Sequence, residues 1–489
     1  MIAVETQEII NTVSPYLLTL ADKSTKERPA KRRAIEAIKK SVGSTKDSLI
    51  ANELLDQLVD PLLICTESEI ETVREQSLQI FKSLVKANSN KATQKETLEK
   101  LLNTILYRLD ATKEPTEEIR AAWMELCIQL LDLHPTQTDL IMNVIQSAVR
   151  DPFPELQKLA GKCIVLFSTA YAQEVDYACD RMVRLVIPLL SHKHIAIRAL
   201  GIRSAQSVLM ASAKGLPLLF ESDESHQGIV PALIYDASPL VRQQLFTSLG
   251  YLLCQWNPRD RYQYGERILP IILSGVFDEL PAVQSTCDST LTEVANSCVH
   301  DLYEAQILES IPEDEKEKKN LGLKHLVHIC YDNSLNDLLE KSTDFVASKQ
   351  ITSLNALKLF LKYATVDDII KSIKKLLNHL IFVYNSPTNT AQSSVIDILT
   401  ILSNVLQSMD VFLDVLLPKL DSKYLNAETS GFSINITIST IICFLNHLLK
   451  ITQSSAHSNL RIKDALTKIK KYPLDSDTSQ RLNKILTSE

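Results

Sequence analysis

The chain has 489 residues and a formal net charge of −7, with 45% hydrophobic and 23% charged residues, proportions typical of a folded protein rather than a disordered one. This mildly acidic balance argues against a protein that binds nucleic acid through a basic surface. Only 10 of the 489 residues are glycine, a share well below the roughly 7% of ordinary proteins. The chain therefore has little material for hairpins, P-loops or dinucleotide-binding turns, and an all-α protein is expected.

The amino-terminal segments 6–22 and 31–42 have helical periodicity and predict a first helix pair. The opening residues MIAVETQEII lack the basic and apolar regions of a secretory signal. No membrane span is expected, because the most apolar stretch, from residue 434, is interrupted by Asn, Thr and Ser. The nine cysteines form no C-x-x-C pair, which favours free thiols inside apolar runs. Cytosol or nucleus is the expected compartment.

A turn pattern recurs between residues 68 and 284: an acid, two residues, proline, one residue, an apolar residue, then Arg or Gln. It is complete in DPFPELQ, DASPLVR and DELPAVQ, which begin at Asp151, Asp236 and Asp278. Relaxed forms begin at Ser68, Glu114 and His192. The closing residues lie 37 to 46 positions apart and are Arg74, Arg120, Gln157, Arg198, Arg242 and Gln284. This period matches the roughly 40–47 residues of HEAT and armadillo repeats.

Each turn opens an apolar-periodic helix and follows another, so the repeating unit is helix A, turn, helix B. No such pair can bury its apolar stripe alone, and stacked neighbours create one continuous core. The sequence therefore predicts an all-α fold, an α-solenoid of HEAT-type antiparallel helix pairs. We expect about seven HEAT repeats over 1–300 and degenerate HEAT-like helical repeats continuing the solenoid over 301–489.

The turn residues themselves are expected to be structural. Asp236 is predicted to N-cap the helix that starts near Pro239, and its loss would cost about 1 kcal/mol. In HEAT repeats, which these units resemble, the turn Asp and the following Arg bond within and between repeats. That resemblance implies a structural ladder of Arg74, Arg120, Asp151, Arg198, Asp236, Arg242, Asp278 and Gln284. An arginine row that binds phosphopeptides is the less favoured alternative.

The sequence changes character after residue 301. The charged stretch ESIPEDEKEKKN, 309–320, predicts an exposed loop or a frayed helix between units. Further helices without the turn pattern are expected over 320–341, 351–364, 366–386, 394–420 and 432–451, and a basic helix near 461–471. A separate domain in this half is not indicated.

No catalytic motif is recognisable. The GKC of 161–163 follows Leu156 where a P-loop needs glycine, and no G-x-S-x-G, H-E-x-x-H or EF-hand pattern occurs. His192 and His194 lack further nearby ligands for a metal. We therefore expect no enzyme activity, no cofactor and no metal. A solenoid of this kind presents its surface to other proteins, and Arg203, Gln243 and Thr247 are the candidate contacts on the concave face.

The stretch IVPALIYDASPLVRQQLFTSLGYLL, followed by RDRYQYGERILPIILSGVFDELPAVQ, resembles the HEAT-repeat axonemal dynein assembly factors of the dynein axonemal assembly factor 5 family. The Arg-Asp-Arg-Tyr of 259–262 leading to LPIILSG is the more specific part. The resemblance implies a cytoplasmic, chaperone-associated scaffold that holds dynein heavy and intermediate chains during cilium biogenesis. It implies no nucleic-acid, membrane or small-molecule partner. We expect a family member to be longer, so a fragment and a divergent member are both open.

Three other functions stay open on the residues. A generic HEAT scaffold would be a karyopherin-like transport receptor or a phosphatase regulatory subunit, although the uneven repeat spacing disfavours the phosphatase subunit. An enzyme would need its site hidden in 301–489. A microtubule-binding array would need basic turns, whereas these turns carry Asp and Glu. The assembly scaffold is the favoured reading.

Overall fold

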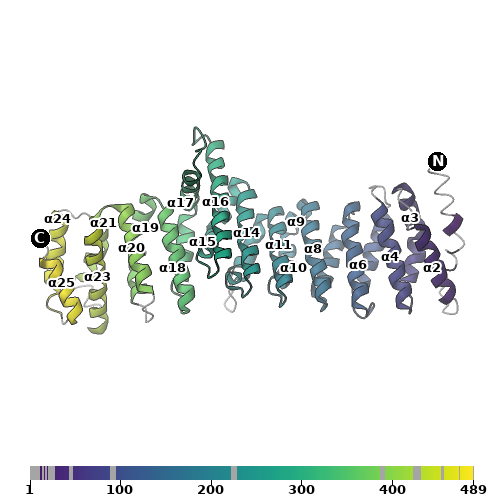
Figure 1. The fold of residues 1–489 in the computed structure, drawn as a ribbon, viewed down its shortest axis with the longest axis horizontal. Coiled ribbons are helices and arrows are strands. Elements are labelled where there is room, and N and C mark those ends of the chain that lie inside the picture. The colour runs from purple at the N-terminus through teal and green to yellow at the C-terminus, as the bar shows by residue number, and fades with distance from the viewer. Residues whose placement is uncertain are drawn as a thin grey trace. The chain divides into compact units, whose positions relative to one another are not determined.

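The computed structural model describes residues 11–13, 16, 19, 28–42, 48–88, 95–221, 228–385, 391–421, 431–452, 456–472 and 474–487. These residues form helices and connecting turns, with no strand in any of the described segments (Figure 1). The chain divides into two compact units, Met1–Leu233 and Ile234–Glu489. The all-α expectation is confirmed. The expected first helix over 6–22 lies largely outside the described residues.

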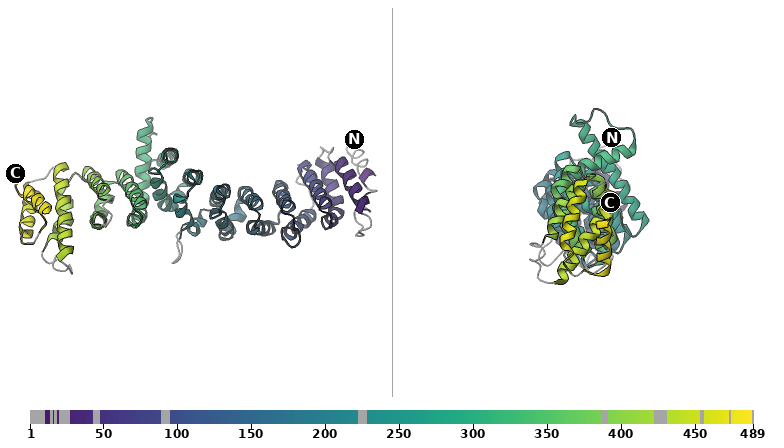
Figure 2. Two further views of the ribbon diagram at one scale, coloured as in Figure 1. Left: turned by 60° about the horizontal axis from the view of Figure 1, so that its bottom comes forward. Right: turned by 90° about the vertical axis from the view of Figure 1, so that its left-hand side faces the viewer.

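The first unit consists of two layers of helices, which Figure 2 shows side by side. One layer, in which each helix contacts the next, is α2 (Arg28–Val42), α4 (Glu71–Ala87), α6 (Glu117–Leu130), α8 (Pro154–Ala170) and α11 (Ile195–Ala211). The other is α3 (Ser48–Cys65), α5 (Lys95–Arg108), α7 (Thr138–Arg150) and α10 (Cys179–Leu190). Short helices complete the unit: η2 (Leu131–Leu133), α9 (Ala172–Tyr177), η3 (Ala213–Gly215), α12 (Leu216–Phe220) and α13 (Ile229–Ala232).

The second unit opens with η4 (Leu233–Tyr235), whose first residue still belongs to the first unit. Its helices are α14 (Pro239–Gln255), α15 (Pro258–Gly275), α16 (Pro281–Glu304), α17 (Glu315–Lys341), α18 (Ala347–Tyr363), α19 (Val366–Tyr384), α20 (Gln392–Leu406), α21 (Met409–Leu416), η6 (Leu417–Leu420), α23 (Gly431–Ile451), α24 (Ala456–Ile469) and α25 (Ser476–Thr487). Helix α17 breaks the regular alternation, because it packs against α15, α16 and α18.

Apolar residues at helical spacing explain the core. In α7, Ile141, Val144, Ile145 and Ala148 are all fully buried, as expected for one face of a helix with 3.6 residues per turn. In α6, Trp123 is the largest fully buried side chain of its unit. Each helix thus buries its stripe between the two layers, which is why neighbouring pairs stabilise one another.

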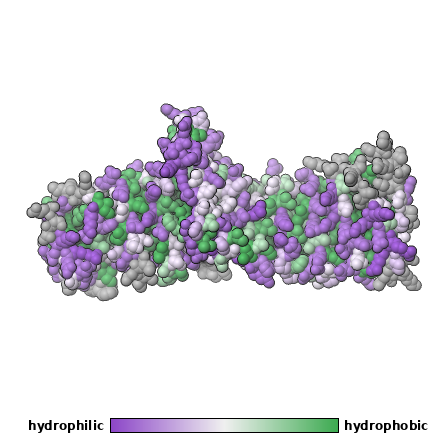
Figure 3. All heavy atoms as spheres, in the orientation of Figure 1, coloured by the Kyte–Doolittle hydropathy of each residue, from purple (hydrophilic) through white to green (hydrophobic). Residues whose placement is uncertain are grey.

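Helices α16 and α17 extend beyond the rest of their unit (Figure 1). Helix α14, against which α16 packs, has 17 residues, whereas α16 has 24 and α17 has 27. Figure 3 shows the projecting end as mostly hydrophilic. The sequence led us to expect a loop or a frayed helix over 309–320. The structure has a loop only to residue 314, and Asp314 caps α17 by accepting a hydrogen bond from the Glu317 N–H at 3.1 Å.

Among the described residues, one helical segment has the length and composition to cross a membrane: Ile434–Ile451, within α23. We expected no membrane span because Asn, Thr and Ser residues interrupt this segment. They do not lower its mean hydropathy below that of a spanning segment. In the structure its apolar side chains Ile438, Ile441, Phe444 and Leu448 are fully buried, and the helix packs against α19, α20 and α25. The segment is placed as a core helix of the array.

Candidate functional site

The recurring turns share a local geometry of two hydrogen bonds, which we call the staple. Its first residue accepts, through the side chain, a hydrogen bond from the backbone N–H two positions later; Asp151, Asp236 and Asp278 accept at 2.8, 2.8 and 2.9 Å. The side chain six positions after the first residue then donates back to the first residue's carbonyl, as Arg242 does to Asp236 at 2.7 Å. The turn at Asp151 has the first bond, but its Gln157 donates to the Val149 carbonyl at 3.3 Å instead of to Asp151. This arrangement fixes the chain as it enters the next helix.

The staple corrects one expectation. The N-cap of α14 is Ser238, and its side chain makes no capping hydrogen bond. Asp236 lies two residues earlier and holds the Ser238 N–H through Oδ1. An Asx turn therefore precedes the helix. Asp236 lies two residues before the N-cap position, and the bond that its carboxylate accepts comes from the Ser238 N–H, before the first helical turn.

Bidentate ion pairs join three of the staples to the next repeat. Arg120 donates from Nε and Nη2 to the Asp151 carboxylate at 2.8 and 3.2 Å, with 3% of each side chain exposed. Arg242 holds Asp278 at 2.7 and 2.9 Å in the same way. The pKa of Arg242 is raised above its ordinary value, chiefly because of the hydrogen bond to Asp278. Such planar pairs fix orientation as well as distance.

The third pair joins Arg74 to Glu114 at 2.7 and 2.9 Å, and the Glu114 side chain is fully buried. The glutamate's Oε1 also accepts from the Thr116 N–H at 3.2 Å, so it serves its own turn and the previous repeat together. Sequence reasoning counted this turn only as a relaxed form. Its carboxylate nevertheless occupies the same structural position as Asp151 and Asp278.

The remaining ladder residues, Arg198 and Gln284, donate to backbone carbonyls of their own turns. Arg198 donates to the carbonyls of His192 and Lys193 at 2.9 and 3.1 Å, and Gln284 donates to the Asp278 carbonyl at 2.5 Å. The His192 ring takes the place of the acid, since its Nδ1 accepts from the His194 N–H at 3.0 Å. These contacts give the two histidines of the turn a local structural use.

The first hydrogen bond of the staple also occurs beyond the part of the chain where we recognised the pattern. Asp344 accepts from the Val346 N–H at 2.8 Å, and Gln350, six positions after Asp344, is 3% exposed at the start of α18. The segment DFVASKQ has no proline, and the residue directly before the glutamine is lysine where the pattern has an apolar residue. The segment therefore does not match the turn pattern. The separation of six between acid and amide was the signal that could have found it.

The RDRY segment fastens α15 to α16. Arg261, which is 4% exposed, donates to the carbonyls of Leu253 and Trp256 at 2.5 and 2.9 Å and pairs with Asp301. The Tyr262 hydroxyl donates to the same carboxylate at 2.7 Å. Burial raises the pKa of Tyr262 far above its ordinary value. The most specific motif of the sequence therefore fixes the base of the projecting α16–α17 hairpin.

The three predicted contact residues differ in their surroundings. Arg203 and Thr247 are exposed. Gln243 is half-buried, and its amide donates to the Ala282 carbonyl at 3.2 Å and reaches Thr286 Oγ1 at 3.5 Å. Gln243 thus contacts the neighbouring helix of its own unit. The use of these residues in partner binding stays a prediction.

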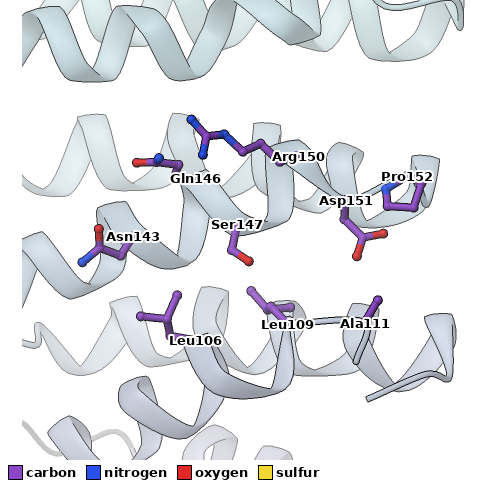
Figure 4. A pocket seen from close by; sticks show the side chains of 9 residues that line it. All are labelled: Leu106, Leu109, Ala111, Asn143, Gln146, Ser147, Arg150, Asp151 and Pro152. Atoms are coloured by element: carbon purple, nitrogen blue, oxygen red, sulfur yellow. The ribbon is translucent and has the colours of Figure 1, made fainter. Parts of the chain in front are cut away.

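A hollow of about 470 Å³ opens between α5 and α7 in the first unit. Figure 4 shows its lining: Leu106, Leu109, Ala111, Asn143, Gln146, Ser147, Arg150, Asp151 and Pro152. A second, of about 340 Å³, lies beside the Asp236 and Asp278 staples and is lined partly by Arg242 and Ser348. Asp151 in the first hollow and Arg242 in the second belong to buried ion pairs, and the first hollow is also lined by the Arg150 guanidinium. No group of three or more His, Cys, Asp or Glu side chains in the described part of the chain could hold a metal.

Comparison with known proteins places this architecture among its relatives. A family model described as dynein axonemal assembly factor 5-like, TPR repeats, matches residues 20–301. Dynein axonemal assembly factor 5 of Xenopus laevis is 25% identical over 289 residues, covering 57% of this chain and 32% of the relative. The Homo sapiens protein of the same name is 22% identical over 395 residues, covering 74% and 43%. The chain therefore spans less than half of these relatives' length.

Among solved structures, the Kap95:Nup1 complex aligns with 99% of this chain and 64% of its own, at 11% identity and a TM-score of 0.41. The repeat spacing of 37 to 46 residues in this chain is longer than the 34 residues of a TPR unit and nearer to the HEAT range. The match to residues 20–301 covers all the staples recognised from sequence.

Proposed function

The chain belongs to the dynein axonemal assembly factor 5-like family, and we propose from this membership that it is a non-enzymatic scaffold for the cytoplasmic preassembly of axonemal dynein arms. In this proposal it holds dynein heavy and intermediate chains together with chaperones before the arms enter the cilium. The family match over residues 20–301 is the observation that carries the proposal.

The physical character of the fold supports a scaffold. Three buried Arg–carboxylate pairs, together with the staples, hold neighbouring repeats in a fixed register. Repeat arrays of this type bind partners over extended surfaces rather than in one deep pocket. Neither hollow described above gathers an unpaired acid, base and nucleophile of the kind catalysis uses.

The test is to remove the endogenous protein from ciliated cells and restore this chain with an affinity tag. We expect dynein heavy and intermediate chains and chaperones to co-purify from the cytoplasmic fraction, and dynein arms to return to the axoneme. Recovery of phosphatase subunits or nuclear pore proteins without dynein, or no return of the arms, would contradict the proposal.

Charge-reversal variants then locate the binding surface. Arg203→Glu changes an exposed position of α11 that we propose as a contact, and Arg184→Glu is a matched change at an exposed position of α10. If α11 faces the client, the first variant lowers dynein recovery and the second leaves it unchanged. Equal effects would remove Arg203 from the proposed surface without affecting the assembly role.

A further inference from the structure

The projecting end of the α16–α17 hairpin is an ordered element. Gly322 of α17 crosses α16 so closely that a Cβ there would lie 2.6 Å from the Ala295 carbonyl carbon. Only a glycine permits this approach between two helix backbones. Beyond the crossing, Asp301 anchors α16 to Arg261 and Tyr262 of α15. The base of the projection is therefore fixed on both helices.

The tip is capped at both helix ends. Gln306 adopts a left-handed conformation with φ of 59°. Its N–H donates to the Tyr303 carbonyl at 3.0 Å, and the Ile307 N–H donates to the Leu302 carbonyl at 2.9 Å. These two bonds form a Schellman motif that ends α16. With the Asp314 cap on α17, the connection has a defined conformation rather than that of a loose linker.

Apolar side chains nevertheless face solvent on this fixed tip, residues 303–317, which we call the knob. Ile307 is 67% exposed, Tyr303 45% and Ile311 40%. The first seven residues of α17 include no buried side chain, and burial along that helix begins at Gly322. A large part of the apolar surface of these three side chains is therefore left in contact with solvent. Clustered exposed apolar groups on a folded protein mark an interaction site.

The charge of the knob selects the partner. Residues 303–317 contain six carboxylates and one lysine, a net charge of −5, although the whole chain carries only −7. Glu309 and Glu313 are exposed, and neither forms an ion pair with another of the described residues. This field repels nucleic acid and anionic lipid. It attracts a cationic segment whose apolar side can cover the isoleucines.

We propose that the knob is a docking site for a cationic amphipathic segment of a partner protein. Apolar side chains of that segment pack on Ile307, Ile311 and Tyr303, and its Lys or Arg residues pair with Glu309 and Glu313. The interaction does not depend on the assembly role, because it rests only on the geometry and charge of residues 303–317. A partner with an acidic or purely polar surface is disfavoured by the same charges.

A direct test uses the full chain and a synthetic peptide of about 14 residues, enough for a short helix, with leucine and lysine arranged on opposite faces. The control peptide has glutamate in place of lysine. Binding is followed by fluorescence anisotropy and by the NMR signals of the isoleucine δ1 methyl groups. We expect the lysine peptide to shift the Ile307 and Ile311 signals and the glutamate peptide to leave them unchanged.

Variants separate the two parts of the site. Glu309→Lys/Glu313→Lys removes the charge attraction, and Ile307→Ser/Ile311→Ser removes the apolar contacts; each should weaken peptide binding at least tenfold. The matched controls are Glu117→Lys/Glu118→Lys, an exposed acidic pair on α6, and Leu460→Ser, which is 58% exposed.

All of these positions are on the surface, so thermal unfolding should be unchanged and verifies folding. Two results would overturn the proposal. The first is that the knob variants bind the lysine peptide as well as the control variants do. The other is methyl shifts that occur away from Ile307 and Ile311.

Discussion

Replacing Asp151 by alanine tests whether the buried ion pairs determine the stability of neighbouring repeats. The Asp151 carboxylate accepts two hydrogen bonds from Arg120 and a third from the Phe153 N–H. In the variant the guanidinium keeps its bonds to the carbonyls of Glu114 and Pro115 but loses its counter-charge while 3% of its side chain is exposed.

The expected cost is large because the remaining charge stays buried. Breaking one partner of a buried pair costs about 3–5 kcal/mol, and the Arg120 bonds to backbone carbonyls place the effect at the lower end. An exposed pair is worth only about 0–1 kcal/mol. Lys100 and Asp60 form such a pair, with side chains 40% and 66% exposed. Asp60→Ala is therefore the matched control.

Native-state hydrogen exchange is the suitable assay, because a repeat array opens locally and a single global transition need not occur. Asp151→Ala should lower the opening free energy of the amides in α6 and α8 by about 3 kcal/mol, and Asp60→Ala by less than about 1 kcal/mol. The double variant Arg120→Met/Asp151→Ala should cost less than the two single changes together, because no unpaired charge remains. Equal costs for Asp151→Ala and Asp60→Ala, or strict additivity in the double variant, would refute the reasoning.

Three further outcomes are expected. Gly322→Ala should destabilise the α16–α17 crossing by about 1–3 kcal/mol in thermal unfolding, since overpacking outweighs alanine's helix propensity; Gly265→Ala, whose Cβ would meet side chains only and come no closer than 3.3 Å, to Cys330 Sγ, should be near neutral, and similar effects would contradict the crossing geometry. Burial lowers the pKa of His379 to about 4, so the histidine stays neutral in the fold while the unfolded chain takes up a proton below its ordinary value of 6.5. His379 should then lower the free energy of unfolding by up to about 3 kcal/mol between pH 6.5 and 4, and His379→Gln should reduce the pH dependence by that amount in urea titrations. Asp344→Ala should lower the stability of α18 by about 1 kcal/mol, as the loss of a helix-entry cap does, measured by exchange of its first amides; no change would remove the staple from that turn.

The local parts of the structure could be read from the sequence. The turn pattern placed the start of α14 at its proline and the other stapled helices within a few residues, because proline, an acidic turn residue and apolar periodicity act over a single turn of chain. The same locality explains the failure at Asp236, where the distinction between a cap and an Asx turn depends on two residues. It also explains how Asp344 was missed, since its turn keeps the spacing without the proline.

The contacts between repeats required the tertiary structure. Arg74 and Glu114 are 40 positions apart, and only the packing distance between α4 and α6 brings the guanidinium to that carboxylate rather than to another of the many acids in the chain. The knob is a second case: the charged stretch 309–320 suggested a loop or a frayed helix, but α17 begins within it at Glu315, and the Gly322 crossing and the Asp301 anchor fix the two helices that flank the connection.

The sequence by itself therefore determined the type of repeat, its period and the residues of the turns, because these depend on interactions within six or seven residues. Tertiary structure decided which charges pair, which polar side chains are used up in packing, and where apolar groups remain exposed. Those features depend on how closely two helices approach, a distance set by the combined packing of many side chains and by single small residues such as Gly322.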